Sequence, residues 1–126
     1  MARPAARDLT ERELEVMHLF WKEGTKTAQE ARDLLAAQGR ELTYPTVANL
    51  VRILHEKGFL NQINGERPFL YEPAKSYRDV YSRMLGEVLD RVFGGSRETL
   101  LLRLMEQKQL SVREREILQG ILEEDA

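Results

Sequence analysis

Residues 42–59 read LTYPTVANLVRILHEKGF and carry the most regular pattern in the chain. Four apolar residues recur there at i, i+3, i+4 and i+7, so the segment is predicted to form a helix with one buried face. Thr43 is typical of a helix start, and Lys57 followed by Gly58 is typical of a helix end. The helix is therefore predicted over residues 43–57. Its apolar stripe consists of Val47, Leu50, Val51 and Leu54.

The opposite stripe of this helix carries polar side chains suited to reading bases in the major groove of DNA. Asn49 can pair with N6 and N7 of adenine, and Arg52 with O6 and N7 of guanine. Any amphipathic helix also has polar residues on its outer face, and periodicity identifies the buried face better than it identifies a ligand. On the helix alone, a plain solvent-facing surface remains an alternative for both residues.

Two predicted helices precede this one. The first is predicted over residues 10–21 and starts with a capping box, in which Thr10 and Glu13 bond each other's backbone. A second capping box starts at Thr27 and opens a shorter helix. The central helix is thus expected to be the third of a three-helix group.

The pattern after Gly58 changes from a helical period to a strand-like one. Residues 59–63 and 69–72 are two short runs with aromatic and branched residues. Asn64-Gly65 between them is a strong hairpin signal, because both residue types tolerate a positive φ. Three helices followed by a hairpin give the order of a winged helix-turn-helix, in which the third helix enters the major groove and the hairpin, or wing, lies alongside.

Eight side chains of the central helix and the wing are predicted to contact DNA. Residues at the N-terminal end of the helix are candidates for bases or phosphates, because groove-reading helices usually contact bases there. His55 and Lys57 near the other end are candidates for phosphates, and Arg67 beside the wing tip for phosphate or the minor groove. Simple capping, packing or solvation is the alternative for each. The full set is Thr43, Tyr44, Thr46, Asn49, Arg52, His55, Lys57 and Arg67.

Three further amphipathic helices are predicted after Pro73, with a break at Gly94-Gly95. They carry more apolar surface than they can hide among themselves, so we expect them to dimerise. The predicted fold is mainly α with a small β-hairpin, with a winged helix-turn-helix domain over residues 1–75 and a helical dimerisation region over residues 76–126. The residues expected in the dimer seam are Tyr77, Tyr81, Met84, Val88, Val92, Leu101, Leu104, Ile117 and Ile121.

Composition argues against several other classes of protein. The 126 residues include no cysteine, and the two histidines, His18 and His55, do not have metal-ligand spacing. No glycine-rich phosphate loop or nucleophile elbow is present, so no enzyme, cofactor or metal site is expected. No apolar run is long enough to span a bilayer and the start lacks a signal peptide's apolar core, so we expect a cytoplasmic protein without a membrane partner.

The charge balance does not favour nucleic-acid binding. The formal net charge is −2, with 11 basic and 11 acidic residues up to Lys75 and 8 basic and 10 acidic residues beyond it. Neither half is basic, which argues mildly against DNA as a partner. Whether basic residues share one face matters more than this bulk charge.

The order and spacing of these motifs resemble the penicillinase repressor family, which includes the BlaI and MecI repressors and has the copper-responsive CopY repressors as relatives. The similar segments cover nearly the whole chain and read LTERELEVMHLFWKEG, TAQEARDLL, YPTVANLVRILHEKGFL, PFLYEP and RVFGGSRETLLLRLMEQKQLS. The resemblance implies a dimeric winged-helix repressor of a palindromic operator, with residues 10–73 binding DNA and residues 76–125 forming the dimer.

Two departures from the family pattern concern the operator and its release. Members often have a Thr and an Arg in the middle of the recognition helix. In place of the Thr this chain has Asn49 or Leu50, and in place of the Arg it has Ile53 with Arg52 just before it, so a different operator sequence is expected. Penicillin-responsive members are cleaved at an Asn-Phe bond, but the matching position reads Arg103-Leu104. The resemblance to CopY implies release through a cysteine metal site, but this chain has no cysteine. A regulatory protease or an unknown inducer is therefore expected as the partner that releases the repressor from DNA.

The sequence therefore predicts a homodimeric transcriptional repressor that binds double-stranded DNA through helix 43–57 and wing 60–72. Two alternatives remain open. One is a winged-helix module for protein–protein contact, which the neutral charge would suit. The other is a regulator that senses a small molecule near Tyr77 and Tyr81.

Overall fold

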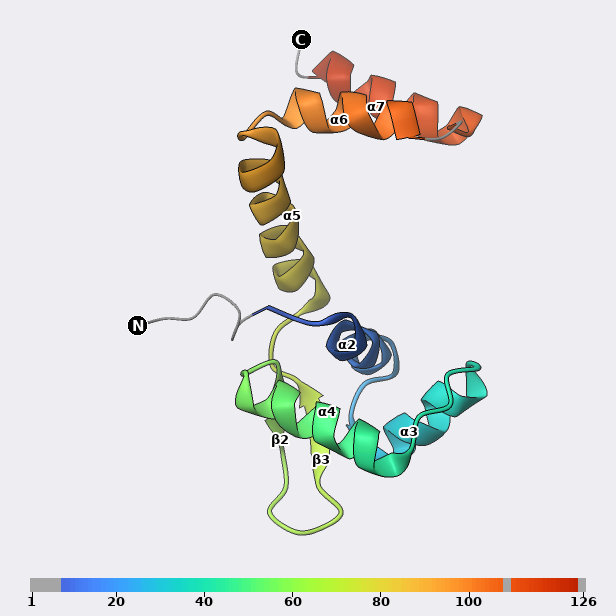
Figure 1. The fold of residues 1–126 in the computed structure, drawn as a ribbon, viewed down its shortest axis with the longest axis vertical. Coiled ribbons are helices and arrows are strands. Elements are labelled where there is room, and N and C mark those ends of the chain that lie inside the picture. Colours follow the sequence, from blue (N-terminus) through green and yellow to red (C-terminus); the bar gives the residue numbers. More distant parts are fainter. Residues whose placement is uncertain (1–7, 108–109, 125–126) are drawn as a thin grey trace. The chain divides into compact units, whose positions relative to one another are not determined.

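The computed structural model describes residues 8–107 and 110–124, which are mostly helical with a small antiparallel sheet (Figure 1). This confirms the predicted fold class. The chain divides into two compact units, one ending at Val80 and one beginning at Tyr81. The elements are α2 (Glu11–Glu23), β1 (Lys26–Thr27), α3 (Ala28–Ala37), α4 (Tyr44–Glu56), β2 (Leu60–Gln62), β3 (Leu70–Pro73), α5 (Tyr77–Phe93), α6 (Arg97–Gln107) and α7 (Val112–Glu124).

Both capping boxes predicted in the first unit are present. At the start of α2, the backbone N–H of Thr10 donates to Oε1 of Glu13 at 3.0 Å, and the N–H of Glu13 donates to the Thr10 hydroxyl at 3.2 Å. Thr27 and Glu30 exchange the same pair of bonds at the start of α3. These bonds satisfy backbone donors that a helix start leaves without partners, which fixes where α2 and α3 begin.

The central helix α4 begins and ends where its sequence signals predict. The Thr43 hydroxyl accepts from the N–H of Thr46, and Gly58 follows the helix with φ +87°. A positive φ is costly for residues with a Cβ, so glycine is suited to this position. All four residues of the predicted apolar stripe are buried. They face a core to which the neighbouring elements contribute Val16, Met17, Leu19, Phe20, Ala31, Leu35, Phe59, Leu60, Tyr71 and Val80.

A three-stranded antiparallel sheet lies beside α4, with the strand order β1-β3-β2. The predicted hairpin corresponds to β2 and β3, in which Asn61 pairs with Glu72. The strand β1 was not predicted, and it pairs Lys26 with Tyr71 and Thr27 with Leu70. We call β2, β3 and the loop between them the wing, and Figure 1 shows this loop extending beyond α4.

The wing loop is held by a side chain and not by the predicted tight turn. Neither Asn64 nor Gly65 has a positive φ, so the turn argument made from this pair was wrong. The Asn64 amide instead donates to the backbone oxygens of Glu66 and Pro68 and accepts from the N–H of Leu70 at 2.8 Å. One amide therefore spans a loop that is too long for a two-residue turn.

The first turn of α5 belongs to the winged-helix unit. Trp21 donates from Nε1 to the Lys75 oxygen at 2.9 Å, and its ring centroid lies 5.0 Å from that of Tyr77. His18 contacts both rings, and Val80 is buried in the core. Tyr77, expected in the dimer seam, thus packs on α2, although about half of its surface stays exposed.

The second unit consists of the rest of α5, α6 and α7. Gly94 and Gly95 separate the first two helices, and a capping box of Ser111 and Glu114 opens α7. Leu118 is the one buried side chain among those the structure describes in this unit. In the described ranges, every helix is too short or too polar to cross a bilayer.

Candidate nucleic-acid interface

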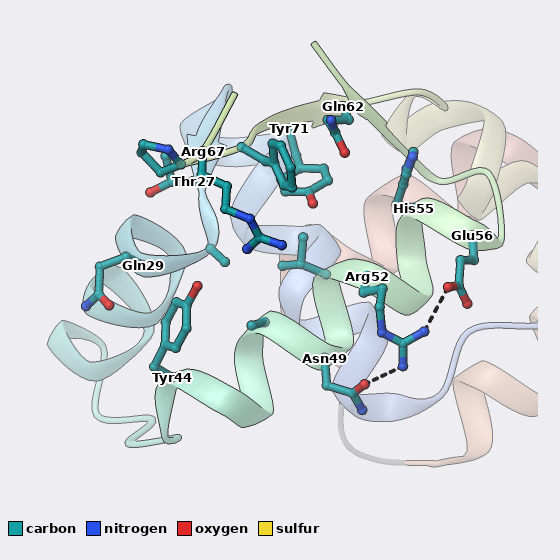
Figure 2. Close-up of a pocket in the computed structure, with 15 residues that line it drawn as sticks. Thr27, Gln29, Tyr44, Asn49, Arg52, His55, Glu56, Gln62, Arg67 and Tyr71 are labelled. Carbon is teal, nitrogen blue, oxygen red and sulfur yellow. Dashed lines mark hydrogen bonds and ion pairs between the residues drawn. The ribbon is translucent and has the colours of Figure 1, made fainter. Parts of the chain in front are cut away.

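A groove of about 780 Å³ lies between α4, the N-terminal end of α3 and the wing (Figure 2). Polar and aromatic side chains from all three elements line it. Five of the eight residues predicted to contact DNA are among them. The lining residues used below are Gln29, Tyr44, Asn49, Arg52, His55, Glu56, Gln62, Arg67, Phe69 and Tyr71.

The outward face of α4 presents three hydrogen-bonded side chains, Asn49, Arg52 and Glu56, which we call the reading stripe. Arg52 donates from Nη1 to Oε2 of Glu56 at 2.8 Å, and from Nη2 to Oδ1 of Asn49. Figure 2 shows the guanidinium between the amide and the carboxylate. The Arg52 and Glu56 side chains are 58% and 62% exposed, so the stripe stays open to a partner.

Arg67 brings a second guanidinium to this groove from the wing. Its Cζ lies 4.9 Å from the centroid of the Phe69 ring, and Figure 2 shows the guanidinium reaching into the groove. Such stacking holds the cation in place without using its N–H donors. Arg67 is therefore placed for an anionic partner next to α4.

Tyr71 lies under the groove where the wing meets α4. Burial raises the pKa of its phenol above the ordinary value of 10.0, and the nearby Arg67 guanidinium partly offsets this shift, while Tyr44 adds slightly to it. The His55 ring contacts the Tyr71 ring at 5.9 Å between centroids, and His55 Nδ1 is buried without a hydrogen-bond partner in the described part of the chain. His55 is thus partly held by packing.

The N-terminal end of α4 carries a second group of predicted contacts. The Thr43 hydroxyl donates to the Thr46 hydroxyl at 3.0 Å while it caps the helix. Tyr44 is 44% exposed and lines the groove. These hydroxyls lie at the positive end of the helix dipole, where anions are favoured.

Lys57 lies outside this interface. Its ammonium donates to Oε1 of Glu13 at 2.8 Å and to the Asp8 oxygen at 2.8 Å, and its side chain is only 18% exposed. The structure thus ties Lys57 to the start of α2 and does not bring it together with the groove residues. The sequence signal of a cation at a helix end could not distinguish these two uses.

Further polar side chains of the groove, among them Gln29, Gln62 and Glu56, were not predicted as contacts. Gln29 comes from the first turn of α3, Gln62 from β2 and Glu56 from the last turn of α4. Glu56 was predictable as a neighbour of Arg52, because residues four apart share a helix face. Gln29 and Gln62 reach the groove only through tertiary packing, which leaves no local pattern.

The described side chains form no group of three or more His, Asp or Glu residues that could hold a metal ion. The arrangement instead offers guanidinium and amide donors, hydroxyls and aromatic faces. Such groups form hydrogen bonds with base edges and phosphates.

A buried three-helix core, a third helix with an exposed polar stripe and a wing beside it define the class of winged helix-turn-helix DNA-binding transcription regulators. The sequence profile of the penicillinase repressor family matches residues 9–124, so the chain belongs to that family. The family is one of transcriptional repressors and not of enzymes.

Relatives match along nearly their whole length. The penicillinase repressor of Bacillus licheniformis is 29% identical, over 92% of this chain and 90% of its own. The methicillin resistance regulatory protein MecI of Mammaliicoccus sciuri is 25% identical, over 91% and 93%.

Two solved structures are similar in fold. The DNA-binding domain of the repressor BlaI matches with a TM-score of 0.51 and 26% identity, over 63% of this chain and 93% of that one. H. salinarum RosR matches with a TM-score of 0.50 over 95% of this chain and 96% of that one. At 16% identity, this second likeness concerns the fold alone.

Proposed function

We propose that the protein is a transcriptional repressor that acts in the cytoplasm and binds a palindromic DNA operator as a homodimer. The observation that carries the proposal is the reading stripe of α4, exposed beside the wing guanidinium of Arg67 in one groove. Family membership supports the same function, since the relatives are named as regulators of penicillinase and methicillin resistance. Repression follows when the bound protein occupies promoter DNA.

The dimensions and chemistry of α4 suit the major groove. Its 13 residues span about 20 Å at 1.5 Å per residue, and the major groove is about 12 Å wide. Asn49 and Arg52 are the residue types that form bidentate contacts with adenine and guanine. The reading stripe can contact bases while the helix stays folded, because the core holds α4 by its opposite face, the apolar stripe from Val47 to Leu54.

Phosphate contacts come from both sides of the stripe. The Thr43, Tyr44 and Thr46 hydroxyls stand at the N-terminal end of α4, and Arg67 stands on the wing. Contacts of this kind set the register of a protein on DNA, whereas base contacts set its specificity. Lys57 is left out of this set because Glu13 already neutralises it.

The homodimer is proposed from the apolar surface of the second unit. Met84, Leu85, Val88 and Val92 of α5 are 37–68% exposed, and Leu104, Ile117 and Ile121 are 42–48% exposed. Leu101, also expected in the seam, is half-buried. Exposed apolar side chains gathered on a few helices are typical of protein–protein contact sites, and a second copy supplies a matching apolar surface. A two-fold dimer would place two α4 helices in half-sites about 34–36 Å apart.

The test is fluorescence anisotropy of the full chain on labelled DNA from upstream of its own gene, with scrambled DNA as competitor. We expect specific binding that weakens on the order of 10³-fold between about 50 and 200 mM salt, because released counterions drive the association. Arg52→Ala should lose specificity at one base pair. Arg83→Ala, which removes a comparably exposed arginine of α5, is the matched control and should retain it.

A folded dimer that binds neither the upstream DNA nor the scrambled DNA at low salt would overturn the proposal. That result would favour a winged helix that contacts proteins, which the net charge of −2 suits better.

A further inference from the structure

We infer that Asn49 and Glu56 are positioning residues, which aim Arg52 at one guanine in each half-site. The inference rests on the proposed function and specifies the base on which its specificity depends. It starts from the hydrogen bonds within the reading stripe, all of which form inside one helix.

The guanidinium of Arg52 is held from two sides. Glu56, one turn further along α4, accepts from Nη1 at 2.8 Å, and Asn49, one turn earlier, accepts from Nη2 (Figure 2). Each terminal nitrogen carries two N–H groups, so each keeps one donor after these bonds form. Arg52 therefore retains a pair of N–H donors on a side chain whose direction is already set.

A pair of donors selects guanine among the four bases. Guanine presents two acceptors, O6 and N7, in the major groove, whereas adenine presents one acceptor beside an amino donor. A bidentate contact of Asn49 with adenine would have to share the amide oxygen that already accepts from Arg52, so the Arg52 bond restricts how the amide can turn toward a base. We therefore assign Asn49 to Arg52 and not to a base of its own.

Glu56 has a second consequence for selectivity. Its carboxylate neutralises Arg52, so the pair adds little net attraction for the phosphate backbone. An exposed i,i+4 ion pair also contributes little to folding stability, which leaves direction as the main effect of this one. Without Glu56, the arginine can turn to a phosphate, and contacts to phosphates carry no sequence information.

The experiment begins by selecting a high-affinity half-site from random DNA with the full-length protein. Each base pair is then varied, and 7-deazaguanine, which lacks the N7 acceptor, replaces each guanine in turn. We expect one guanine per half-site at which any other base weakens binding about 10- to 100-fold, in line with one bidentate contact. The 7-deaza replacement should weaken binding at that same position.

Substitutions then separate positioning from reading. Glu56→Leu and Asn49→Leu remove an acceptor of Arg52 and should each reduce the preference for this guanine about tenfold, whereas Asn49→Asp, which keeps an oxygen acceptor, should retain most of it. Glu56→Gln keeps an oxygen acceptor but loses the charge, so it should reduce the preference less than Glu56→Leu does. Glu56→Gln should also strengthen binding to scrambled DNA and steepen the salt slope by about one, the value for one added phosphate contact. Glu87→Gln makes the same charge change in the exposed Arg83–Glu87 pair of α5 and should leave the ratio of specific to scrambled affinity unchanged.

Two outcomes would overturn the inference while the proposed function stands. In one, Arg52→Ala abolishes the guanine preference but Glu56→Leu and Asn49→Leu retain it, so Arg52 reads without help. In the other, 7-deazaadenine and not 7-deazaguanine weakens binding, so Asn49 reads adenine itself. A wild-type protein that binds no DNA would overturn both this inference and the proposed function. Circular dichroism of each variant confirms that α4 is folded, which is expected because all three residues are exposed.

Discussion

Replacing Lys57 with methionine should destabilise the winged-helix unit far more than a typical surface substitution. Lys57 bonds Glu13, whose side chain is only 6% exposed, at 2.8 Å. The substitution keeps most of the apolar stem but leaves the Glu13 carboxylate buried without its cation. The effect links the start of α2 to the end of α4, two segments far apart in sequence.

The magnitude follows from the contacts that remain. Removing one partner of a buried ion pair costs about 3–5 kcal/mol. Glu13 would keep the N–H of Thr10 as a donor, and the 18% exposure of Lys57 shows that water already reaches the pair. We therefore expect a loss of about 2–3 kcal/mol in the free energy of unfolding, at or just below the lower limit of that range. The double variant Glu13→Gln with Lys57→Met should recover most of it, because no charge stays buried.

Urea unfolding followed by the fluorescence of Trp21 measures this loss. Trp21 is the single tryptophan of the chain and lies in α2, so it reports the unit that contains the pair. Arg40→Met is the matched control, because Arg40 bonds Glu15 at the same 2.8 Å but both side chains are about 40% exposed. The control should lose less than about 1 kcal/mol. If Lys57→Met loses no more than Arg40→Met, burial of the pair does not set its energy and the reasoning is refuted.

Three other substitutions test separate features. Burial raises the pKa of Tyr71, so the stability that the neutral phenol contributes is complete below about pH 10 and is lost as the pH rises through the pKa of the folded state. Tyr71→Phe should reduce this alkaline loss of stability in unfolding followed by Trp21 fluorescence, and an unchanged loss would contradict the prediction. Gly58→Ala should lower the free energy of unfolding by about 1–2 kcal/mol. The loss comes from the backbone φ of +87° alone, because no atom lies within 4 Å of the added Cβ, and an unchanged urea midpoint would argue against backbone strain. Val88→Asp puts a carboxylate on the exposed apolar face of α5 and should give a helical monomer in sedimentation equilibrium, whereas a persistent dimer would move the interface elsewhere.

Local sequence signals predicted the elements of the fold that depend on neighbours in the chain. The capping boxes at Thr10 and Thr27 involve residues three apart, and the stripe from Val47 to Leu54 has a helical period, so each could be read directly. The same reasoning placed Asn49 and Arg52 together on the outer face of α4. These features are local because helix geometry fixes which residues meet.

Features that depend on tertiary contacts were missed or assigned another role. The strand Lys26–Thr27 has two residues, too few for an alternating pattern, and exists because β3 pairs with it. The Asn64 amide replaced the expected tight turn by bonding a backbone group six residues away. The partner of Lys57 lies 44 residues away, which no window of sequence around the helix end contains.

The division of α4 into two stripes has a consequence for how such proteins diverge. The residues that hold α4 in the core and the residues of the reading stripe share the helix but not a single position. Substitutions at exposed helix positions usually change stability by less than about 0.5 kcal/mol. A gene duplicate can therefore acquire a new target sequence through changes at positions 49, 52 and 56 while its fold stays intact. The target genes of related regulators can therefore change faster than the fold of these proteins does.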